Sequence, residues 1–97
     1  MSKLRVSRDA AADLDEIWLY IAKRGGVEAA QRHINHLTGK FDIIALTPGM
    51  GRERNELKSG IRSHAVDDYV VYYRQKKGLV TILHVMHGAR DVKELFR

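Results

Sequence analysis

The sequence predicts a two-layer α+β fold, in which an antiparallel helical hairpin packs on a small antiparallel sheet. The first half of the chain contains two consecutive stretches with the periodicity of amphipathic helices. The second half contains three strand-like runs joined by short turns, which predicts an antiparallel meander. A short alternating run precedes the helices, and we expect this N-terminal strand to join one edge of the meander.

The N-terminal segment predicts a strand followed by a helix. Polar and apolar residues alternate in residues 2–7, which places Leu4 and Val6 on one face of a strand. Ser7 or Asp9 can then cap a helix, because either side chain accepts a hydrogen bond from a free N–H group of the first turn. The apolar stripe of this helix consists of Ala10, Leu14, Ile17, Trp18 and Ile21.

A second helix follows after a very short connection. Gly25 and Gly26 are predicted to end the first helix, since glycine adopts the left-handed conformation of a helix end without steric cost. Helical periodicity resumes near Val27 and ends before Pro48, so the two helices should pack as an antiparallel hairpin. The apolar stripe of the second helix consists of Ala30, Ile34, Leu37, Phe41 and Ile44.

The second half predicts a loop, a meander and a short tail. Residues 49–60 are polar and glycine-rich, which predicts a loop with one helical turn at residues 53–57. Residues 79–87 form the longest and most apolar run, so we expect this strand at the centre of the sheet. Residues 92–96 predict either a helical turn or a short strand. The strand-like runs span residues 61–66, 69–74 and 79–87, with turns at residues 67–68 and 76–78.

Length and composition limit the classes of protein. A chain of 97 residues provides for one hydrophobic core, which predicts a single domain over residues 1–97. The absence of cysteine excludes disulfide scaffolds, thiolate zinc sites and cysteine nucleophiles. No apolar run approaches the roughly 20 residues that span a bilayer, and the first residues lack the apolar region of a signal peptide. We therefore expect a cytoplasmic protein with no membrane partner.

The positive charge lies mainly in the second half of the chain. The net charge is +5, and residues 1–48 contribute +1 from seven basic and six acidic residues. Residues 49–97 contribute +4 from ten basic and six acidic residues. This asymmetry indicates an acidic partner, either nucleic acid or an acidic protein surface. The alternative stays open, because basic charge alone is also compatible with a small domain that binds no nucleic acid.

Neither a metal site nor a cofactor site is predicted. His33 and His36 lie three residues apart on a helix, but no third ligand is near them in the sequence. His84 and His87 lie three residues apart on a strand and therefore face opposite sides. Phosphate loops, dinucleotide fingerprints and hydrolase nucleophile elbows are absent from the sequence.

Polar residues cluster near the predicted strand ends. Arg62 opens one strand, Arg74 ends the next, and His87, Arg90 and Asp91 follow the longest strand. Arginine with histidine can bind a phosphate and transfer a proton, the minimum for metal-independent RNA cleavage. The same residues could equally form a structural network of ion pairs, and both interpretations remain open.

Several motifs spread over nearly the whole chain resemble one family. The tail His87-Gly88-Ala89-Arg90-Asp91 is the most distinctive of them. The others are Ser7 with Ala10, Asp13-Leu14, Ile17, Tyr20, Leu46-x-Pro48-x-x-Gly51 with Arg52, Glu56-Leu57, Gly60, Arg62, Tyr69-Val70-Val71-Tyr72-Tyr73 and Ile82-Leu83-His84-Val85. Their order and spacing resemble the ParE branch of the ParE/RelE superfamily of type II toxins.

This resemblance implies a function as well as the RelE-like fold. Such proteins are the toxins of toxin–antitoxin pairs, which are associated with growth arrest and plasmid stabilisation. A cognate antitoxin, ParD-like or similar, wraps a flexible C-terminal segment around the toxin in a hetero-oligomer. ParE-like members inhibit DNA gyrase, whereas RelE-like members cut messenger RNA on the ribosome.

The residues favour gyrase inhibition over RNA cleavage. Arg62 and Arg90 match two basic positions of the ribonuclease branch, and His87 could replace its proton carrier. The C-terminal aromatic position of that branch falls at Phe96, which has no hydroxyl group. We therefore expect a binding-type toxin without catalytic residues. The alternative is a ribosome-dependent endoribonuclease that uses Arg62, His87 and Arg90.

Binding residues can be nominated from the same positions. Trp18 lies on the apolar stripe and is expected in the core, whereas Tyr20 lies off the stripe and is expected to contact the antitoxin. An open edge strand could also accept an extended antitoxin segment. The candidates for target or antitoxin binding are Tyr20, Arg52, Arg54, Lys58, Arg62, Arg74, His87, Arg90 and Asp91.

Overall fold

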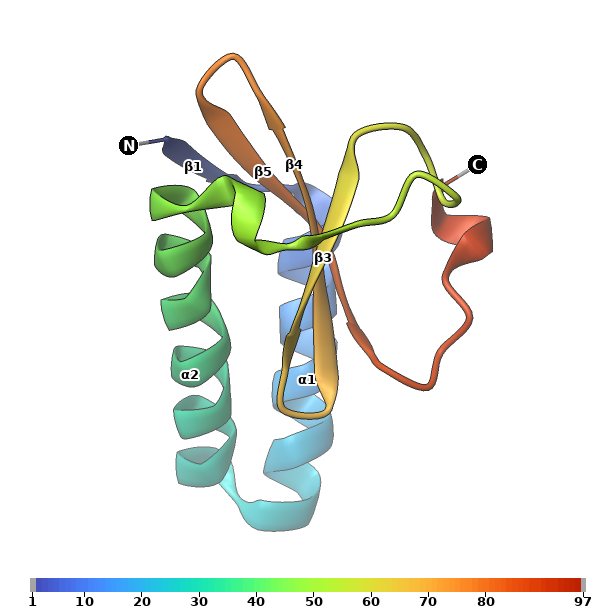
Figure 1. The fold of residues 1–97 in the computed structure, drawn as a ribbon. Helices are drawn as coiled ribbons and strands as arrows, with labels where there is room; N and C mark the ends of the chain where they lie inside the picture. The colour runs from blue at the N-terminus through green and yellow to red at the C-terminus, as the bar shows by residue number, and fades with distance from the viewer. Residues whose placement is uncertain (1, 97) are drawn as a thin grey trace.

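The structure, a computed structural model that describes residues 2–96, has two helices packed on a five-stranded sheet (Figure 1). The predicted α+β class and the helical hairpin are confirmed. Short 3₁₀ turns follow the second helix and end the described chain. The elements are β1 (Lys3–Val6), α1 (Arg8–Gly25), α2 (Val27–Leu46), η1 (Pro48–Met50), β2 (Arg52–Glu53), β3 (Ile61–Val66), β4 (Tyr69–Lys76), β5 (Leu79–His87) and η2 (Lys93–Phe96).

The sheet is mixed rather than wholly antiparallel. Its strand order is β1-β5-β4-β3-β2, and β3, β4 and β5 form the predicted meander. The N-terminal strand β1 joins the β5 edge in parallel, with Leu4 opposite Val80. The expectation that residues 79–87 form the central strand is wrong, because β2 extends the other edge and makes β4 the middle strand.

Both helices bury the predicted stripes against one face of the sheet, which we call the helix face. Ala10 and Ile17 of α1 are buried there, and so are the stripe residues of α2 except the partly buried Ile34. Trp18 is only half-buried and lies outside the core clusters, which corrects the prediction. The reason is geometric, because Trp18 lies about 100° around the helix from Ile17, at the margin of the stripe.

The opposite face of the sheet, which we call the tail face, carries a second cluster. Ile61, Tyr72 and Met86 pack there against Val92 and Phe96 of the C-terminal tail. The tail ends in the 3₁₀ turn η2, which decides between the two predicted alternatives in favour of a helical turn. Figure 1 shows this tail (red) on the side of the sheet away from α2. The helices therefore cover one face of the sheet, and the tail covers only part of the other face.

The loop after α2 is more ordered than the sequence predicts. The expected helical turn at residues 53–57 is wrong, because Arg52–Glu53 pair with β3 as strand β2. Two hydrogen-bonded turns follow. In the first, the N–H groups of Leu57 and Lys58 donate to the carbonyl of Arg54 at 3.0 and 3.4 Å, and in the second the N–H group of Ile61 donates to the carbonyl of Lys58 at 3.1 Å. Pairing with β3 satisfies the backbone of residues 52–53 and excludes helical geometry at those two positions.

The two hairpin turns lie where the sequence predicts them. The β4–β5 turn places Lys77 at φ 51° and Gly78 at φ 76°, the left-handed pair that a two-residue hairpin requires. The β3–β4 turn begins with Asp67 at φ 54°. Within residues 2–96, neither long helix carries the apolar stretch that a membrane crossing would need.

Candidate functional site

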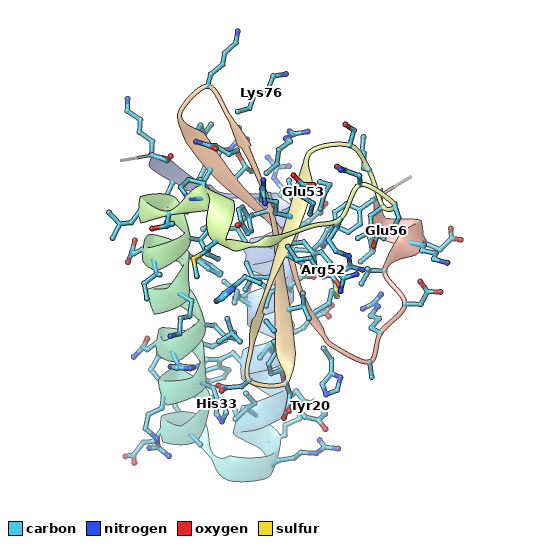
Figure 2. All side chains as sticks on the ribbon, viewed as in Figure 1. Tyr20, His33, Arg52, Glu53, Glu56 and Lys76 are labelled. Atoms are coloured by element: carbon cyan, nitrogen blue, oxygen red, sulfur yellow. The ribbon has the colours of Figure 1, made fainter. Side chains whose placement is uncertain are left out.

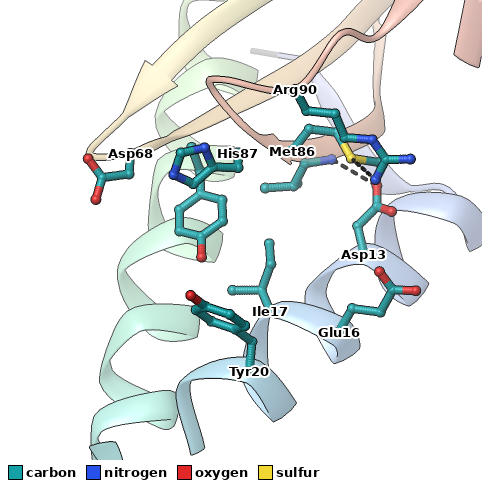
Figure 3. A pocket seen from close by; sticks show the side chains of 10 residues that line it. Asp13, Glu16, Ile17, Tyr20, Asp68, Met86, His87 and Arg90 are labelled. Carbon is teal, nitrogen blue, oxygen red and sulfur yellow. Dashed lines mark hydrogen bonds between the residues drawn. The ribbon is translucent and has the colours of Figure 1, made fainter. Parts of the chain in front are cut away.

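A cleft of about 500 Å³ opens between α1 and the end of the meander (Figure 3). One helix, two neighbouring strand ends and the start of the tail supply its walls. The residues that line it are Asp13, Glu16, Ile17 and Tyr20 from α1, Asp68 and Tyr69 at the start of β4, Val85, Met86 and His87 at the end of β5, and Arg90 from the tail.

The α1 wall follows from helical periodicity. Asp13, Glu16, Ile17 and Tyr20 are spaced three, one and three residues apart, so they share one face of the helix. Ile17 is buried, whereas Tyr20, which lies off the apolar stripe, is 54% exposed. The guanidinium of Arg24 stacks on the Tyr20 ring, 4.0 Å from its centroid, and so restrains the ring.

Asp13 fixes α1 to the edge of β5. Strand β1 ends opposite Ile82, so the backbone of β5 beyond that point has no strand neighbour on this side. Helix α1 instead provides the hydrogen-bond partner for this part of the β5 backbone. The Oδ2 atom of Asp13 accepts a hydrogen bond from the N–H group of Val85 at 3.0 Å and lies 2.9 Å from Nδ1 of the buried His84.

Two further contacts complete this junction. The Oγ atom of Ser7 accepts from the N–H group of Ala10 as the helix cap and donates to the carbonyl of Leu83 at 3.0 Å. Leu83 is an extra residue in β5, because Tyr72 is paired with His84 and Tyr73 with Ile82. This bulge turns His84 to the tail face, where its ring meets Phe96 edge-on at 5.6 Å.

The meander wall of the cleft is aromatic. Tyr69 and His87 are cross-strand partners, and their rings meet edge-on with centroids 5.8 Å apart. Burial, with smaller contributions from Tyr20 and Asp68, raises the pKa of the Tyr69 phenol. The Nδ1 atom of His87 accepts a hydrogen bond from the N–H group of Ala89, so the neutral ring carries its proton on Nε2.

The start of the tail is held in place beside these rings. The N–H group of Gly88 donates to the carbonyl of Asp68 at 2.8 Å, and that of Arg90 donates to the carbonyl of His87 at 3.0 Å. The side chain of Arg90 contacts the sulfur of Met86 at 3.4 Å. The cleft therefore has an apolar base at Ile17 and Met86, with carboxylates and cations at its rim. This composition suits a peptide that inserts an apolar side chain and presents charges around it.

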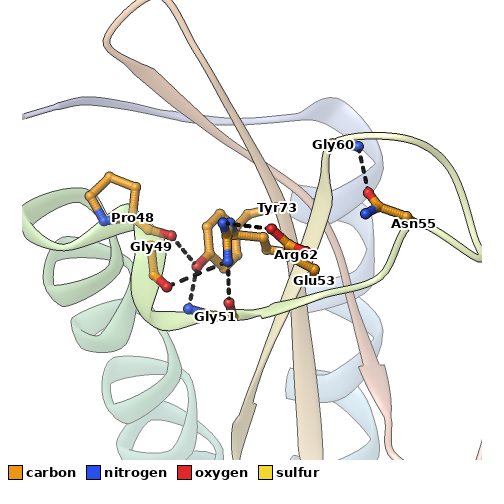
Figure 4. Close-up of polar contacts among 8 residues, drawn as sticks. All are labelled: Pro48, Gly49, Gly51, Glu53, Asn55, Gly60, Arg62 and Tyr73. Atoms are coloured by element: carbon orange, nitrogen blue, oxygen red, sulfur yellow. Dashed lines mark hydrogen bonds and ion pairs between the residues drawn. The ribbon is translucent and has the colours of Figure 1, made fainter.

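A separate polar network anchors the loop after α2 (Figure 4). The hydroxyl of Tyr73 donates to the carbonyl of Pro48 at 2.6 Å and accepts from the N–H group of Gly51 at 2.8 Å. Arg62 donates to the carbonyl of Gly51 at 2.7 Å and lies 3.3 Å from a carboxylate oxygen of Glu53. Burial raises the pKa of Tyr73, although the Gly51 hydrogen bond and Arg62 oppose this shift.

The remaining basic residues of the loop differ in their contacts and exposure. Arg54 binds Glu56 at 2.7 Å and lies over the Tyr72 ring at 5.6 Å. Its hydrogen bond with Glu56 raises the pKa of Arg54 and lowers that of Glu56. Arg52 and Lys58 are exposed. The tip of the loop is closed by a hydrogen bond from the N–H group of Gly60 to Oδ1 of Asn55 (Figure 4).

The structure brings together some of the predicted site residues and separates others. Tyr20, His87 and Arg90 line the same cleft. Arg62 lies opposite Tyr73 of β4, whereas His87 lies opposite Tyr69. These two β4 positions are four residues apart, about 13 Å along the strand. The three residues of the ribonuclease alternative therefore do not form one cluster.

Other nominated residues have structural roles or lie elsewhere. Asp91 accepts a hydrogen bond from the N–H group of Lys93 and so begins η2. Arg74 is exposed near the β4–β5 turn. His36 pairs with Asp67 at 3.2 Å, yet nowhere in residues 2–96 do three potential ligands meet in a metal-binding arrangement.

Sequence reasoning did not nominate the carboxylates of the cleft. Asp13, Glu16 and Asp68 all line it, and none was predicted as a site residue. A signal for Asp13 was available, because an acidic residue three positions after Ala10 and four before Ile17 lies on the inner side of the helix. For Asp68 no such signal existed, since its place beside α1 depends on tertiary packing.

Comparisons with known proteins agree on one family. A family model described as "ParE toxin of type II toxin-antitoxin system, parDE" matches residues 4–92. The chain is 39% identical over 92 residues to Toxin ParE1 of Caulobacter vibrioides, covering 93% of this chain and 96% of that protein. It is 30% identical over 92 residues to Toxin ParE1 of Mycobacterium tuberculosis, covering 94% of each. A solved chain described as "Chromosomal ParDE TA system from P. aeruginosa" shares the fold, with a TM-score of 0.80, 24% identity and coverage of 90% of this chain and 96% of that chain.

Proposed function

Because this chain belongs to the ParE toxin family of type II toxin–antitoxin systems, we propose that it arrests growth in the cytoplasm by inhibiting DNA gyrase. A ParD-like antitoxin neutralises it by occupying the cleft beside α1. In this proposal the protein acts by binding and contributes no catalytic residue of its own.

One observation carries the choice of a binding function over RNA cleavage. Phe96, at the position where ribonuclease relatives need an aromatic hydroxyl, is 8% exposed and packs on Tyr72 with ring centroids 5.4 Å apart. It serves as an apolar anchor for the tail. The separation of Arg62 from His87 supports the same conclusion, because proton transfer and phosphate binding need groups within hydrogen-bond reach of one substrate.

The cleft supports the antitoxin proposal through its shape and charge. A flexible segment can insert an apolar side chain above Ile17 and Met86, and its charges can meet Glu16 or Arg90 at the rim. Tyr20 is the exposed aromatic residue at this rim and is restrained by Arg24. We infer that Tyr20 is a principal contact, since restrained aromatic side chains lose little entropy on binding.

The gyrase proposal is tested with purified gyrase and supercoiled plasmid. We expect linear plasmid to accumulate when the toxin is added and the reaction is stopped with detergent and protease. Adding the cognate antitoxin first should prevent this. A parallel translation extract should retain intact messenger RNA. Uncleaved plasmid together with cut messenger RNA would refute gyrase inhibition and establish the ribonuclease alternative.

The antitoxin contact is tested with a matched pair of α1 variants. Leu19 and Tyr20 are neighbours with nearly equal exposure, 53% and 54%, but only Tyr20 lines the cleft. We expect Tyr20→Ala to weaken antitoxin binding by about tenfold or more, as for an interface hot spot. Leu19→Ala should bind like the wild type in the same calorimetric titration. Equal affinities for both variants would place the antitoxin elsewhere.

A further inference from the structure

Four basic side chains form a flat group on the tail face of the sheet, next to the β4–β5 turn. We call this group the cationic face, and it consists of Lys3, Arg5, Arg74 and Lys76. Its residues come from β1 and β4, which lie on either side of β5. Arg5 and Arg74 are both paired with Thr81, and Lys3 and Lys76 are both paired with Leu79.

The alternation of strand residues places all four side chains on the same side. Leu4 and Val80 pack in the core of the helix face, so their immediate neighbours along the strands point to the tail face. Neighbouring strands are about 4.8 Å apart, so the Cα atoms of Arg5 and Arg74, with β5 between them, are about 10 Å apart. Successive basic residues on one strand are about 7 Å apart. The Cα atoms of the four residues therefore form a compact rectangle, with all four side chains on the tail face.

The four side chains of the cationic face are open to solvent. All four side chains are exposed, and within the described chain none of them takes part in an ion pair. The acidic strand residue Glu53 forms an ion pair with Arg62. Both belong to the strand residues whose side chains point to the helix face, opposite to the cationic face. The tail covers a different part of this face, at Tyr72 and Met86. Figure 2 shows Lys76 projecting from the tip of the β4–β5 hairpin.

We propose that the cationic face binds the phosphate backbone of duplex DNA, and this role rests on the proposed inhibition of gyrase. The complementarity is one of charge, because a duplex carries one negative charge for about every 1.7 Å of its axis. In the complex with gyrase, the face would hold the toxin against the DNA that the enzyme has bound. The contacts are sequence-independent, as backbone contacts are in general.

Two observations favour duplex DNA over other anionic partners. Proteins that bind single strands stack bases on exposed aromatic rings, but the tail-face aromatics Tyr72 and Phe96 are only 4% and 8% exposed. Protein partners that bind tightly place anchor side chains in desolvated pockets at the centre of the interface. The middle of the cationic face offers only the half-buried Thr81 and Leu79, which lie on a flat strand.

Fluorescence anisotropy with a labelled duplex of about 20 base pairs tests the proposal. We expect four phosphate contacts to give a slope of about −3.6 in log K against log salt concentration. The double variant Arg5→Gln/Arg74→Gln should lower the affinity by about tenfold or more and make the slope shallower by about 1.8. The matched control is Lys23→Gln/Arg32→Gln, which removes the same charge from exposed positions on the helices. Circular dichroism verifies that both double variants are folded.

The control separates a specific surface from net charge. The control variant should bind the duplex like the wild type. Equal losses in both double variants would refute a localised site, and so would tighter binding of a single strand or of polyglutamate than of the duplex.

The gyrase assay distinguishes this inference from the proposed function. We expect Arg5→Gln/Arg74→Gln to reduce plasmid linearisation as well as duplex binding. Weaker duplex binding with unchanged linearisation would refute the role of the cationic face in the gyrase complex and leave gyrase inhibition standing. Duplex binding by a wild-type toxin that leaves plasmid intact would refute gyrase inhibition and leave the surface assignment standing.

Discussion

The phenol of Tyr73 accepts a hydrogen bond from the backbone N–H group of Gly51 at 2.8 Å, and the two residues are 22 positions apart in the chain. The same hydroxyl donates to the carbonyl of Pro48. Tyr73 is fully buried in the middle strand, so the loop after α2 is attached directly to the core. The hydroxyl thereby holds two backbone groups of this loop that are three positions apart.

Replacing Tyr73 by phenylalanine tests this attachment. Tyr73→Phe leaves the carbonyl of Pro48 and the N–H group of Gly51 without their partner. We expect the free energy of unfolding, measured by urea denaturation, to fall by about 1–3 kcal/mol. Tyr20→Phe is the control at an exposed site, where the change should stay within about 0.5 kcal/mol. Equal stability of both variants would show that the Tyr73 hydrogen bonds are dispensable.

Gly51 itself should not tolerate a side chain. A Cβ atom there would overlap the Tyr73 hydroxyl and lie 2.8 Å from the nearest ring carbons. We expect Gly51→Ala to lower the free energy of unfolding by about 1–3 kcal/mol through overpacking. Gly49→Ala is the matched control in the same loop, because a Cβ atom at Gly49 meets nothing within 4 Å. Thermal unfolding of both variants checks the prediction. A destabilised Gly49→Ala together with an unchanged Gly51→Ala would contradict it.

Stability should decline in alkaline solution. Burial raises the pKa of Tyr73, and burial with Tyr20 and Asp68 raises that of Tyr69, above the ordinary value of 10.0. A raised pKa in the folded state means that stability is complete below the unfolded value and is lost as pH rises through the folded one. Urea midpoints should therefore fall as the pH rises above about 10. Tyr73→Phe should show a smaller fall than the wild type, and a midpoint that rises over this range would exclude the assignment.

The Asp13 carboxylate should contribute strongly to the junction between α1 and β5. Asp13→Asn removes the charge that Val85 and His84 both contact. We expect a loss of about 1.5–3 kcal/mol, as for hydrogen bonds to a charged acceptor. Asp15→Asn, an exposed site two residues away on the same helix, should change stability by less than about 0.5 kcal/mol. Equal urea midpoints for the two variants would contradict the role assigned to Asp13.

Local signals in the sequence were sufficient for most of the fold. The α2 stripe from Ala30 to Ile44 and the strand at residues 79–87 follow from periodicity, which depends only on neighbouring residues. The parallel direction of β1 and the added strand β2 could not be predicted. Both depend on which strand edge is free after the meander forms, and no local sequence pattern predicts which edge that is.

The candidate site was predicted only in part for the same reason. Tyr20, His87 and Arg90 were nominated from their residue types and positions, and they do line one cleft. The cleft itself was not predicted, because it arises from the packing of α1 beside the β5 bulge at Leu83. A bulge of one residue leaves the alternation of apolar residues almost unchanged, so the sequence gives little sign of it.

The pairing of β1 with β5 has a consequence during protein synthesis. Ser7 is hydrogen-bonded to Leu83, 76 residues later in the chain, and Asp13 depends on Val85 in the same way. The helical hairpin can form early from local contacts, whereas the sheet is complete only when β5 has left the ribosome. A partly translated chain therefore has neither the cleft nor the cationic face. Translation itself delays the appearance of both proposed binding surfaces until nearly all of these residues have been made.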